Sequence, residues 1–173
     1  MEYIRDLLRS LYSTGYLTVS KVYDYSTHWG EKQPPRERHA QFSLTTRTRA
    51  FFAPPDKIVS FDTGSELYVG SAFNAAMITT LKSLNISAVV NTTEEVPAFW
   101  DYSGHIDYRV LSLRDVEAQG INSKEVQRVL NFIHFYVSRG ENVFIHCFMG
   151  ASRSVMIATL YLMARRNWKH EQA

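Results

Sequence analysis

The chain reads His-Cys-Phe-Met-Gly-Ala-Ser-Arg-Ser from His146 to Ser154, and this stretch contains its only cysteine. An apolar, β-branched stretch at 143–145 precedes it, and a stretch with helical periodicity, 155–163, follows it. The sequence therefore predicts a strand, a tight loop and a helix in succession. Such a turn directs backbone N–H groups and the positive end of the helix dipole into one small concavity, which suits a phosphate dianion. A cysteine at its rim is expected to be a thiolate near neutral pH, because these dipoles and a nearby guanidinium stabilise the negative charge.

The residues of this loop match the needs of phosphoryl transfer. Cys147 is the candidate nucleophile, which would attack phosphorus and form a covalent intermediate. Arg153 offers a planar, permanently charged fork for two phosphoryl oxygens, and Ser154 can donate a hydrogen bond to the thiolate. Gly150 permits a conformation in which the N–H groups converge, and we interpret His146 as a residue that orients the loop rather than one that transfers a proton. The remaining loop residues are expected to bind phosphate through their backbone: Phe148, Met149, Ala151 and Ser152.

This stretch resembles the signature of the protein tyrosine phosphatase superfamily, and its form His-Cys-x2-Gly-x-Ser-Arg-Ser resembles that of the dual-specificity branch. Three further stretches, 67–72, 86–91 and 161–163, are similar to that branch at the expected places. The resemblance covers approximately residues 61–173 and implies a catalytic domain there that needs no cofactor and no metal. Residues 1–60 would then form an N-terminal extension that packs on this domain or regulates it.

A candidate general acid stands upstream of the cysteine. Short phosphatases of this branch carry an aspartate about thirty residues before the cysteine, and Asp115 lies at that interval, where a predicted strand gives way to a loop with Gly120. A carboxylic acid there can protonate the leaving group and then act as a base toward water. A turn or cap role for Asp115 is the alternative. Asp107, which precedes the strand, and Glu117, further along the loop, are competing acids.

Length and composition predict one globular domain, and the order of predicted elements indicates the α/β class. With 45% hydrophobic residues among 173, the chain can bury one substantial core and is short for two. Strands that alternate with helices predict a central, mostly parallel sheet flanked by helices on both sides. The predicted strands lie near 66–69, 86–91, 107–113 and 143–146, and the predicted helices near 72–84, 155–163 and from a cap at Ser123 to about 138. Before them we expect a short helix over 2–13, a strand over 16–23 and a polar loop over 24–57.

Charge and cysteine content bear on location and partners. The single cysteine fits a reducing compartment, no apolar run is long enough to cross a membrane, and the N-terminus lacks the order of a signal peptide. We therefore expect a cytoplasmic or nuclear protein. The net charge of +2 gives no reason to expect nucleic acid or a membrane as a partner. The sequence leaves the oligomeric state open.

The function that the sequence favours is a phosphoprotein phosphatase acting on phosphotyrosine and on phosphoserine or phosphothreonine. Phe148 and Met149 put no cation in the loop, so nothing predicts a preference for highly charged inositol phosphates. A phosphatase of lipid, glycan or RNA stays open as an alternative. A phospho-binding module without turnover is disfavoured, because nucleophile, arginine and candidate acid are all present. Domains of the branch usually continue with further helices beyond the point where this chain ends, and the sequence leaves open whether these are missing.

Overall fold

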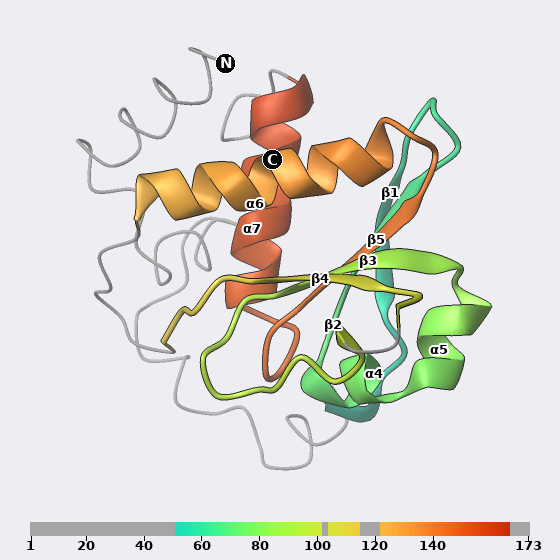
Figure 1. Ribbon diagram of the computed structural model, residues 1–173, viewed down its shortest axis with the longest axis vertical. Coiled ribbons are helices and arrows are strands. Elements are labelled where there is room, and N and C mark those ends of the chain that lie inside the picture. The colour runs from blue at the N-terminus through green and yellow to red at the C-terminus, as the bar shows by residue number, and fades with distance from the viewer. Residues whose placement is uncertain (1–50, 102–103, 115–121, 167–173) are drawn as a thin grey trace, which may run out of the picture.

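The structure is a computed structural model that describes residues 51–101, 104–114 and 122–166. Its centre is a five-stranded sheet in the order β1-β2-β5-β3-β4, with helices on both faces (Figure 1). The elements, in chain order, are β1 (Asp56–Ser60), β2 (Glu66–Gly70), α4 (Ala72–Ala76), α5 (Ile78–Ser83), β3 (Ile86–Asn91), β4 (Asp107–Val110), α6 (Ser123–Val137), β5 (Asn142–His146) and α7 (Arg153–Arg166). None of the described helices is both long and apolar enough to cross a membrane.

The sheet is parallel except at one edge. β2, β5, β3 and β4 pair in parallel, and β1 pairs antiparallel with β2. The predicted mixed α/β fold with a mostly parallel sheet is thus confirmed. The register places Gly70 and Asn91 beside His146, so the carboxyl ends of β2, β3 and β5 meet at one edge. Open parallel sheets bind their ligands at this edge.

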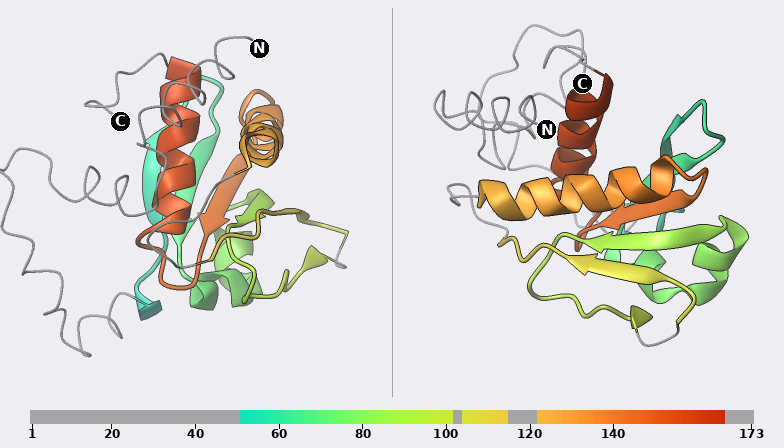
Figure 2. Two further views of the ribbon diagram at one scale, coloured as in Figure 1. Left: turned by 90° about the vertical axis from the view of Figure 1, so that its left-hand side faces the viewer. Right: turned by 45° about the horizontal axis from the view of Figure 1, so that its top comes forward.

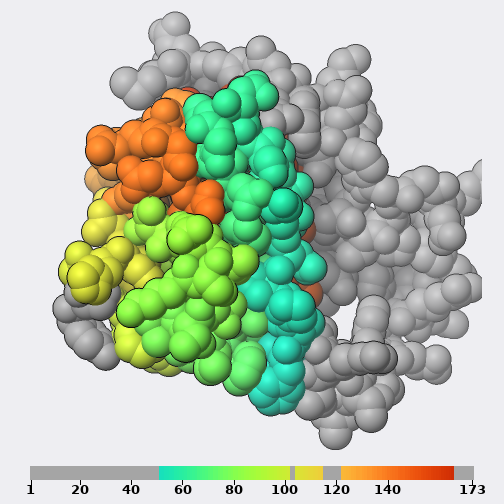
Figure 3. Space-filling model, turned by 90° about the vertical axis from the view of Figure 1, so that its right-hand side faces the viewer, coloured from blue at the N-terminus to red at the C-terminus, as the bar shows by residue number. Residues whose placement is uncertain are grey.

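Side chains that alternate along the strands build a core on each face. One face packs against α6 and α7, and the other packs against α4 and α5 (Figure 2). Leu67 and Ile145 point to the first face, whereas Tyr68 and Phe144 point to the second. Figure 3 shows the outer side of the second layer, where the green segment with α4 and α5 lies beside the cyan segment with β1.

The two long helices differ in how they meet the core. α6 buries one stripe, as its spacing predicts, and leaves its other face exposed. The side chain of Asn122 caps it by accepting from the Lys124 N–H at 3.0 Å, so the predicted cap at Ser123 is wrong by one residue. α7 is buried on most of its surface, and the stripe of α6 packs against it. The buried residues of α6 are Val126, Val129, Leu130, Ile133, Tyr136 and Val137.

Three other predictions differ from the structure. The predicted helix 72–84 is two helices that meet at Met77, which has an extended backbone. The predicted strand 107–113 ends early, at Val110. β1 lies partly in the stretch predicted to be loop. The predicted helix 2–13 and strand 16–23 lie outside the described residues.

Candidate active site

The loop with the only cysteine follows β5 and leads into α7, as the sequence predicts. Gly150 lets the loop pass close to the end of β2, and Gly70 at that end leaves room for Asn74 and Phe144. Gly150 has a φ of +80°, and a Cβ there would lie 2.7 Å from the carbonyl carbon of Gly70. A Cβ on Gly70 would in turn lie 2.6 Å from the Asn74 side-chain oxygen. The Ala72 N–H donates to the Phe148 carbonyl at 3.0 Å, which fixes the loop against α4.

Cys147 lies at the base of this loop and is 2% exposed. Its sulfur accepts hydrogen bonds from the Gly150 N–H at 3.1 Å and the Ser154 hydroxyl at 3.4 Å. Burial by itself raises the pKa of the thiol. Hydrogen bonds from the Ser154 hydroxyl and from the N–H groups of Ser154, Ser152 and Gly150 outweigh burial, so the pKa of Cys147 is below its ordinary value. The local structure therefore favours a thiolate.

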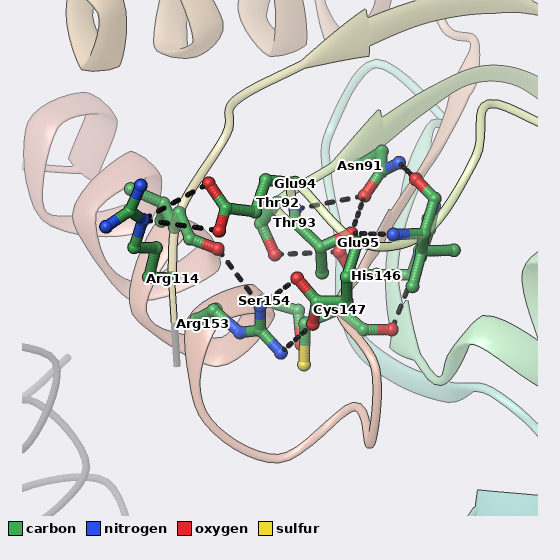
Figure 4. Close-up of polar contacts among 12 residues, drawn as sticks. Asn91, Thr92, Thr93, Glu94, Glu95, Arg114, His146, Cys147, Arg153 and Ser154 are labelled. Carbon is green, nitrogen blue, oxygen red and sulfur yellow. Dashed lines mark hydrogen bonds and ion pairs between the residues drawn. The ribbon is translucent and has the colours of Figure 1, made fainter. Parts of the chain in front are cut away.

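Among the described residues, Arg153 is the largest fully buried side chain, at 1% exposure, and a glutamate contacts it. Its Nη2 lies 2.7 Å from Glu95 Oε1, and its Nη1 donates to Glu95 Oε2 and to the Leu113 carbonyl, each at 3.0 Å. Figure 4 shows the guanidinium in the curve of the loop that also holds Cys147. The hydrogen bond from the guanidinium holds the pKa of Glu95 below its usual range. These contacts fix the plane of the guanidinium.

Sequence reasoning missed Glu95, because 58 positions separate it from Arg153. A signal was nevertheless present. Two adjacent glutamates, Glu94 and Glu95, follow the predicted strand 86–91, and the carboxyl ends of parallel strands meet at one edge. The structure gives the two glutamates different partners, since Glu94 pairs with Arg114 at 3.2 Å in an exposed position.

A hydrogen-bonded turn joins the glutamates to the strand of the nucleophile. Thr92 donates twice to the His146 carbonyl, from its N–H at 2.9 Å and its hydroxyl at 2.8 Å. The Asn91 side chain accepts from the Thr93 N–H and hydroxyl and donates to the Val96 carbonyl at 2.6 Å (Figure 4). The turn with the glutamates follows β3 and the cysteine loop follows β5, so both segments of the site begin at the ends of neighbouring strands.

His146 is fully buried, and its ring stacks on Phe144 with 5.8 Å between centroids. Its Nδ1 lies 3.3 Å from the Cys147 carbonyl. Burial lowers the pKa of His146 to about 4, so the ring is neutral at neutral pH. This geometry supports the interpretation that the histidine orients the loop.

Of the three candidate general acids, the structure describes only Asp107. Asp115 and its competitor Glu117 lie outside the described residues. The preceding Leu113 contacts Arg153 through its carbonyl, so the chain reaches the site just before Asp115. Asp107 begins β4 opposite Ala88, away from the end where Asn91 meets the loop, and it accepts a hydrogen bond from the Tyr136 hydroxyl. Its position supports the expectation that Asp107 lies at the wrong end of the strand.

Comparison with known proteins points to one family. The family described as "Dual specificity phosphatase, catalytic domain" matches residues 67–173. Dual specificity protein phosphatase 1 of Mus musculus is 33% identical over 119 residues, which are 69% of this chain and 30% of that protein. Dual specificity protein phosphatase 9 of Homo sapiens is 32% identical over 99 residues, which are 57% of this chain and 26% of that protein. The chain thus spans less than a third of the length of these two curated relatives.

Solved structures share the fold. The crystal structure of DUSP15 is 25% identical, with a TM-score of 0.56 over 67% of this chain and 69% of that one. The crystal structure of human DUSP28 is 20% identical, also with a TM-score of 0.56, over 68% of this chain and 76% of that one. The family match covers the sheet from β2 onward, the cysteine loop and α7. The chain therefore belongs to the dual specificity phosphatase family.

Proposed function

We propose that this chain is a cysteine-dependent phosphatase that hydrolyses phosphotyrosine and phosphoserine or phosphothreonine in proteins. The observation that carries the proposal is the sulfur of Cys147, which accepts hydrogen bonds from Gly150 and Ser154 in the loop that leads to the buried Arg153. A lowered thiol pKa and a fixed guanidinium are what attack on a phosphate dianion requires.

The reaction would proceed in two displacements. The Cys147 thiolate attacks phosphorus, the phosphorus–oxygen bond to the substrate breaks, and the departing oxygen takes a proton from the predicted acid, Asp115. Water then attacks the cysteinyl phosphate and gives a proton to the same carboxylate. The sulfur–phosphorus bond breaks, and phosphate and the thiolate are released. The Ser154 hydroxyl would stabilise the thiolate before and after, and Arg153 would hold two phosphoryl oxygens throughout.

The side chains of the loop support a protein substrate. Between Cys147 and Arg153 they carry no charge, so the loop offers a single phosphoryl group one cation, that of Arg153. A highly charged inositol phosphate would need further cations around the site. A thiolate nucleophile also requires a reducing compartment, so we place the activity in the cytoplasm or nucleus.

The test measures turnover of an aryl phosphate, a panel of phosphopeptides and a panel of phosphoinositides, with wild type and Cys147→Ser. We expect wild type to hydrolyse the aryl phosphate and the peptides, and the variant to retain less than about one percent of that activity while it still binds phosphate ligands. Rapid acid quench of the wild type should reveal one added phosphoryl group on the peptide that contains Cys147. Because Cys147 is the sole thiol, iodoacetamide should inactivate wild type, and inorganic phosphate should protect it.

Each alternative has its own outcome. Hydrolysis of phosphoinositides with no hydrolysis of phosphopeptides would replace the protein substrate by a lipid. Phosphopeptide binding with no turnover of any substrate would identify a binding module. Turnover by Cys147→Ser at more than about one percent of wild type would contradict the covalent mechanism.

A further inference from the structure

Four phenylalanines form a continuous aromatic surface beside the cysteine loop, which we name the aromatic platform: Phe51, Phe52, Phe73 and Phe148. Phe148 is the residue after the nucleophile, Phe73 lies in α4, and Phe51 and Phe52 precede β1. Ring centroids are 5.5 Å apart for Phe148 and Phe51, 5.1 Å for Phe51 and Phe52, and 4.8 Å for Phe52 and Phe73. The four rings therefore extend in contact from the loop outward.

Backbone contacts hold the platform in place. The Ser71 hydroxyl donates to the Phe51 carbonyl at 2.6 Å, and the Asn74 side chain donates to the Ala53 carbonyl at 2.9 Å. These bonds tie the segment before β1 to the start of α4. The Ala72 N–H ties the same point to the Phe148 carbonyl. The start of α4 thus contacts both the platform segment and the phosphate loop, and these hydrogen bonds connect the platform to the loop that carries Cys147.

The platform leaves much of its apolar surface open. Phe52 is 56% exposed and Phe148 is 46% exposed, and none of the four side chains carries a charge. Contiguous exposed apolar side chains are typical of interaction sites, whereas single exposed apolar residues are not. Here the platform begins at the residue next to the nucleophile and so continues the surface on which a phosphorylated residue would lie.

We propose that the aromatic platform binds a large apolar side chain located within two residues of the phosphorylated residue of the substrate. Neighbouring Cα atoms in an extended peptide are about 3.8 Å apart. A peptide whose phosphate reaches Cys147 would therefore carry its next side chains over Phe148 and on toward Phe52. Substrates with leucine or phenylalanine at these positions would be preferred over substrates with serine, glycine or glutamate. This inference rests on the proposed phosphatase function and names the peptide class that the site selects.

The test compares two phosphopeptides that differ only in the residues flanking the phosphorylated one, which are apolar in one peptide and polar in the other. The readout is the ratio of their kcat/KM values. We expect wild type to favour the apolar peptide by roughly tenfold, the effect of burying one large side chain. Phe52→Ala should reduce the ratio to about two, and Phe52→Leu should retain most of it.

Phe135→Ala is the matched control, because Phe135 is 52% exposed and lies on α6, outside the platform. The control should keep the wild-type ratio. A wild-type ratio near one, in an enzyme that hydrolyses an aryl phosphate, would overturn the platform proposal and leave the phosphatase function standing. A ratio that falls equally in Phe135→Ala would also overturn it.

Binding provides a readout that needs no turnover. Affinities of the same two peptides for Cys147→Ser, measured by fluorescence anisotropy, should show the same preference, and Phe52→Ala should reduce it in that background. Equal binding of both peptides, or no binding of either, would contradict the proposal even if no substrate is ever hydrolysed. Light scattering of wild type and Phe52→Ala completes the test. Loss of a dimer in the variant with an unchanged peptide ratio would assign the platform to contact between two copies of the chain and would overturn the peptide proposal.

Discussion

Glu94 and Glu95 are neighbours in the chain and similarly exposed, yet the arginines that they pair with lie in opposite environments, one exposed and one buried. Glu95 binds the fully buried Arg153 through both carboxylate oxygens, whereas Glu94 binds Arg114 with side chains that are 47% and 68% exposed. Exposed pairs contribute about 0–1 kcal/mol and weaken in salt, whereas removing one partner of a buried charge leaves the other desolvated and unpaired. The comparison teaches that burial of the arginine, more than the presence of an ion pair, ties one glutamate to the site.

The largest difference should come from the arginines themselves. We expect Arg153→Lys to lower kcat/KM by roughly 10²–10³-fold, because an ammonium replaces neither the planar fork nor the three contacts to Glu95 and Leu113. Steady-state kinetics with an aryl phosphate measures the loss. Arg114→Lys is the matched control and should change kcat/KM by less than about twofold. Equal losses in the two variants would show that burial does not distinguish the pairs.

The glutamates should differ less, in activity and in stability. Glu95→Gln removes the charge opposite Arg153, so we expect kcat/KM to fall by about tenfold and the free energy of unfolding by about 1–3 kcal/mol, discounted because the Glu95 side chain is 42% exposed. Glu94→Gln should cost less than about 1 kcal/mol and leave activity near wild type. Urea denaturation and steady-state kinetics give both quantities.

A double-mutant cycle sharpens the same contrast. We expect the effects of Glu95→Gln and Arg153→Lys on stability to be non-additive, because the two side chains make two direct polar contacts. The cycle of Glu94→Gln and Arg114→Lys should be additive within about 0.5 kcal/mol. Additivity in both cycles would mean that Arg153 is held mainly by the Leu113 carbonyl.

Acid should destabilise the folded protein through His146, which is buried next to Cys147. Burial, with a smaller contribution from the charge of Arg153, lowers the pKa of His146 to about 4 from an ordinary value of 6.5. Between these values the unfolded chain binds a proton that the folded chain does not, so stability falls as the pH is lowered from about 6.5 to about 4, by up to roughly 3 kcal/mol. Urea denaturation at several pH values measures this slope.

Two histidine variants separate His146 from other acid-sensitive groups. His146→Asn should flatten the slope between pH 4 and 6.5, whereas His105→Asn, at an exposed position, should retain it. An unchanged slope in His146→Asn would assign the acid sensitivity to other groups.

The smallest expected effect concerns the thiol. Ser154→Ala removes the hydroxyl that donates to the Cys147 sulfur, so the pKa of Cys147 should rise, and the midpoint of iodoacetamide alkylation against pH should move up by less than about one pH unit. Ser152→Ala is the matched control, because Ser152 contributes through its N–H, which the variant keeps. A downward shift in Ser154→Ala, or an equal upward shift in Ser152→Ala, would contradict this assignment.

The predictable parts of the fold are those with buried, patterned side chains. Strands 86–91 and 143–146 and the stripe of α6 bury most of their apolar residues, and the structure has them within a residue of the predicted bounds. β1 was missed because it is an edge strand whose side chains are mostly exposed, so no hydrophobic pattern marks it. The break at Met77 contains neither glycine nor proline, and local propensity gives no sign of it.

The predictable part of the site is the part whose residues are close together in the sequence. The cysteine loop is local in sequence, so spacing and residue type were enough to predict the strand, loop and helix around Cys147 and Arg153. Glu95 and the Leu113 carbonyl reach Arg153 from 58 and 40 positions away and depend on the strand order, which no motif records. The aromatic platform is likewise assembled from three separate segments.

The close contact between Gly70 and Gly150 limits which substitutions the site can accept. A side chain at Gly150 would enter the backbone of Gly70, and a side chain at Gly70 would enter Asn74 and Phe144, so neither position can relieve the other. In a saturation library selected for function, Gly150 should keep glycine, because its φ is positive and a side chain there would meet backbone atoms. A larger residue at Gly70 should appear only together with smaller side chains at Asn74 or Phe144. Variation that alters substrate choice would therefore collect around the loop, at positions such as Phe52, rather than within it.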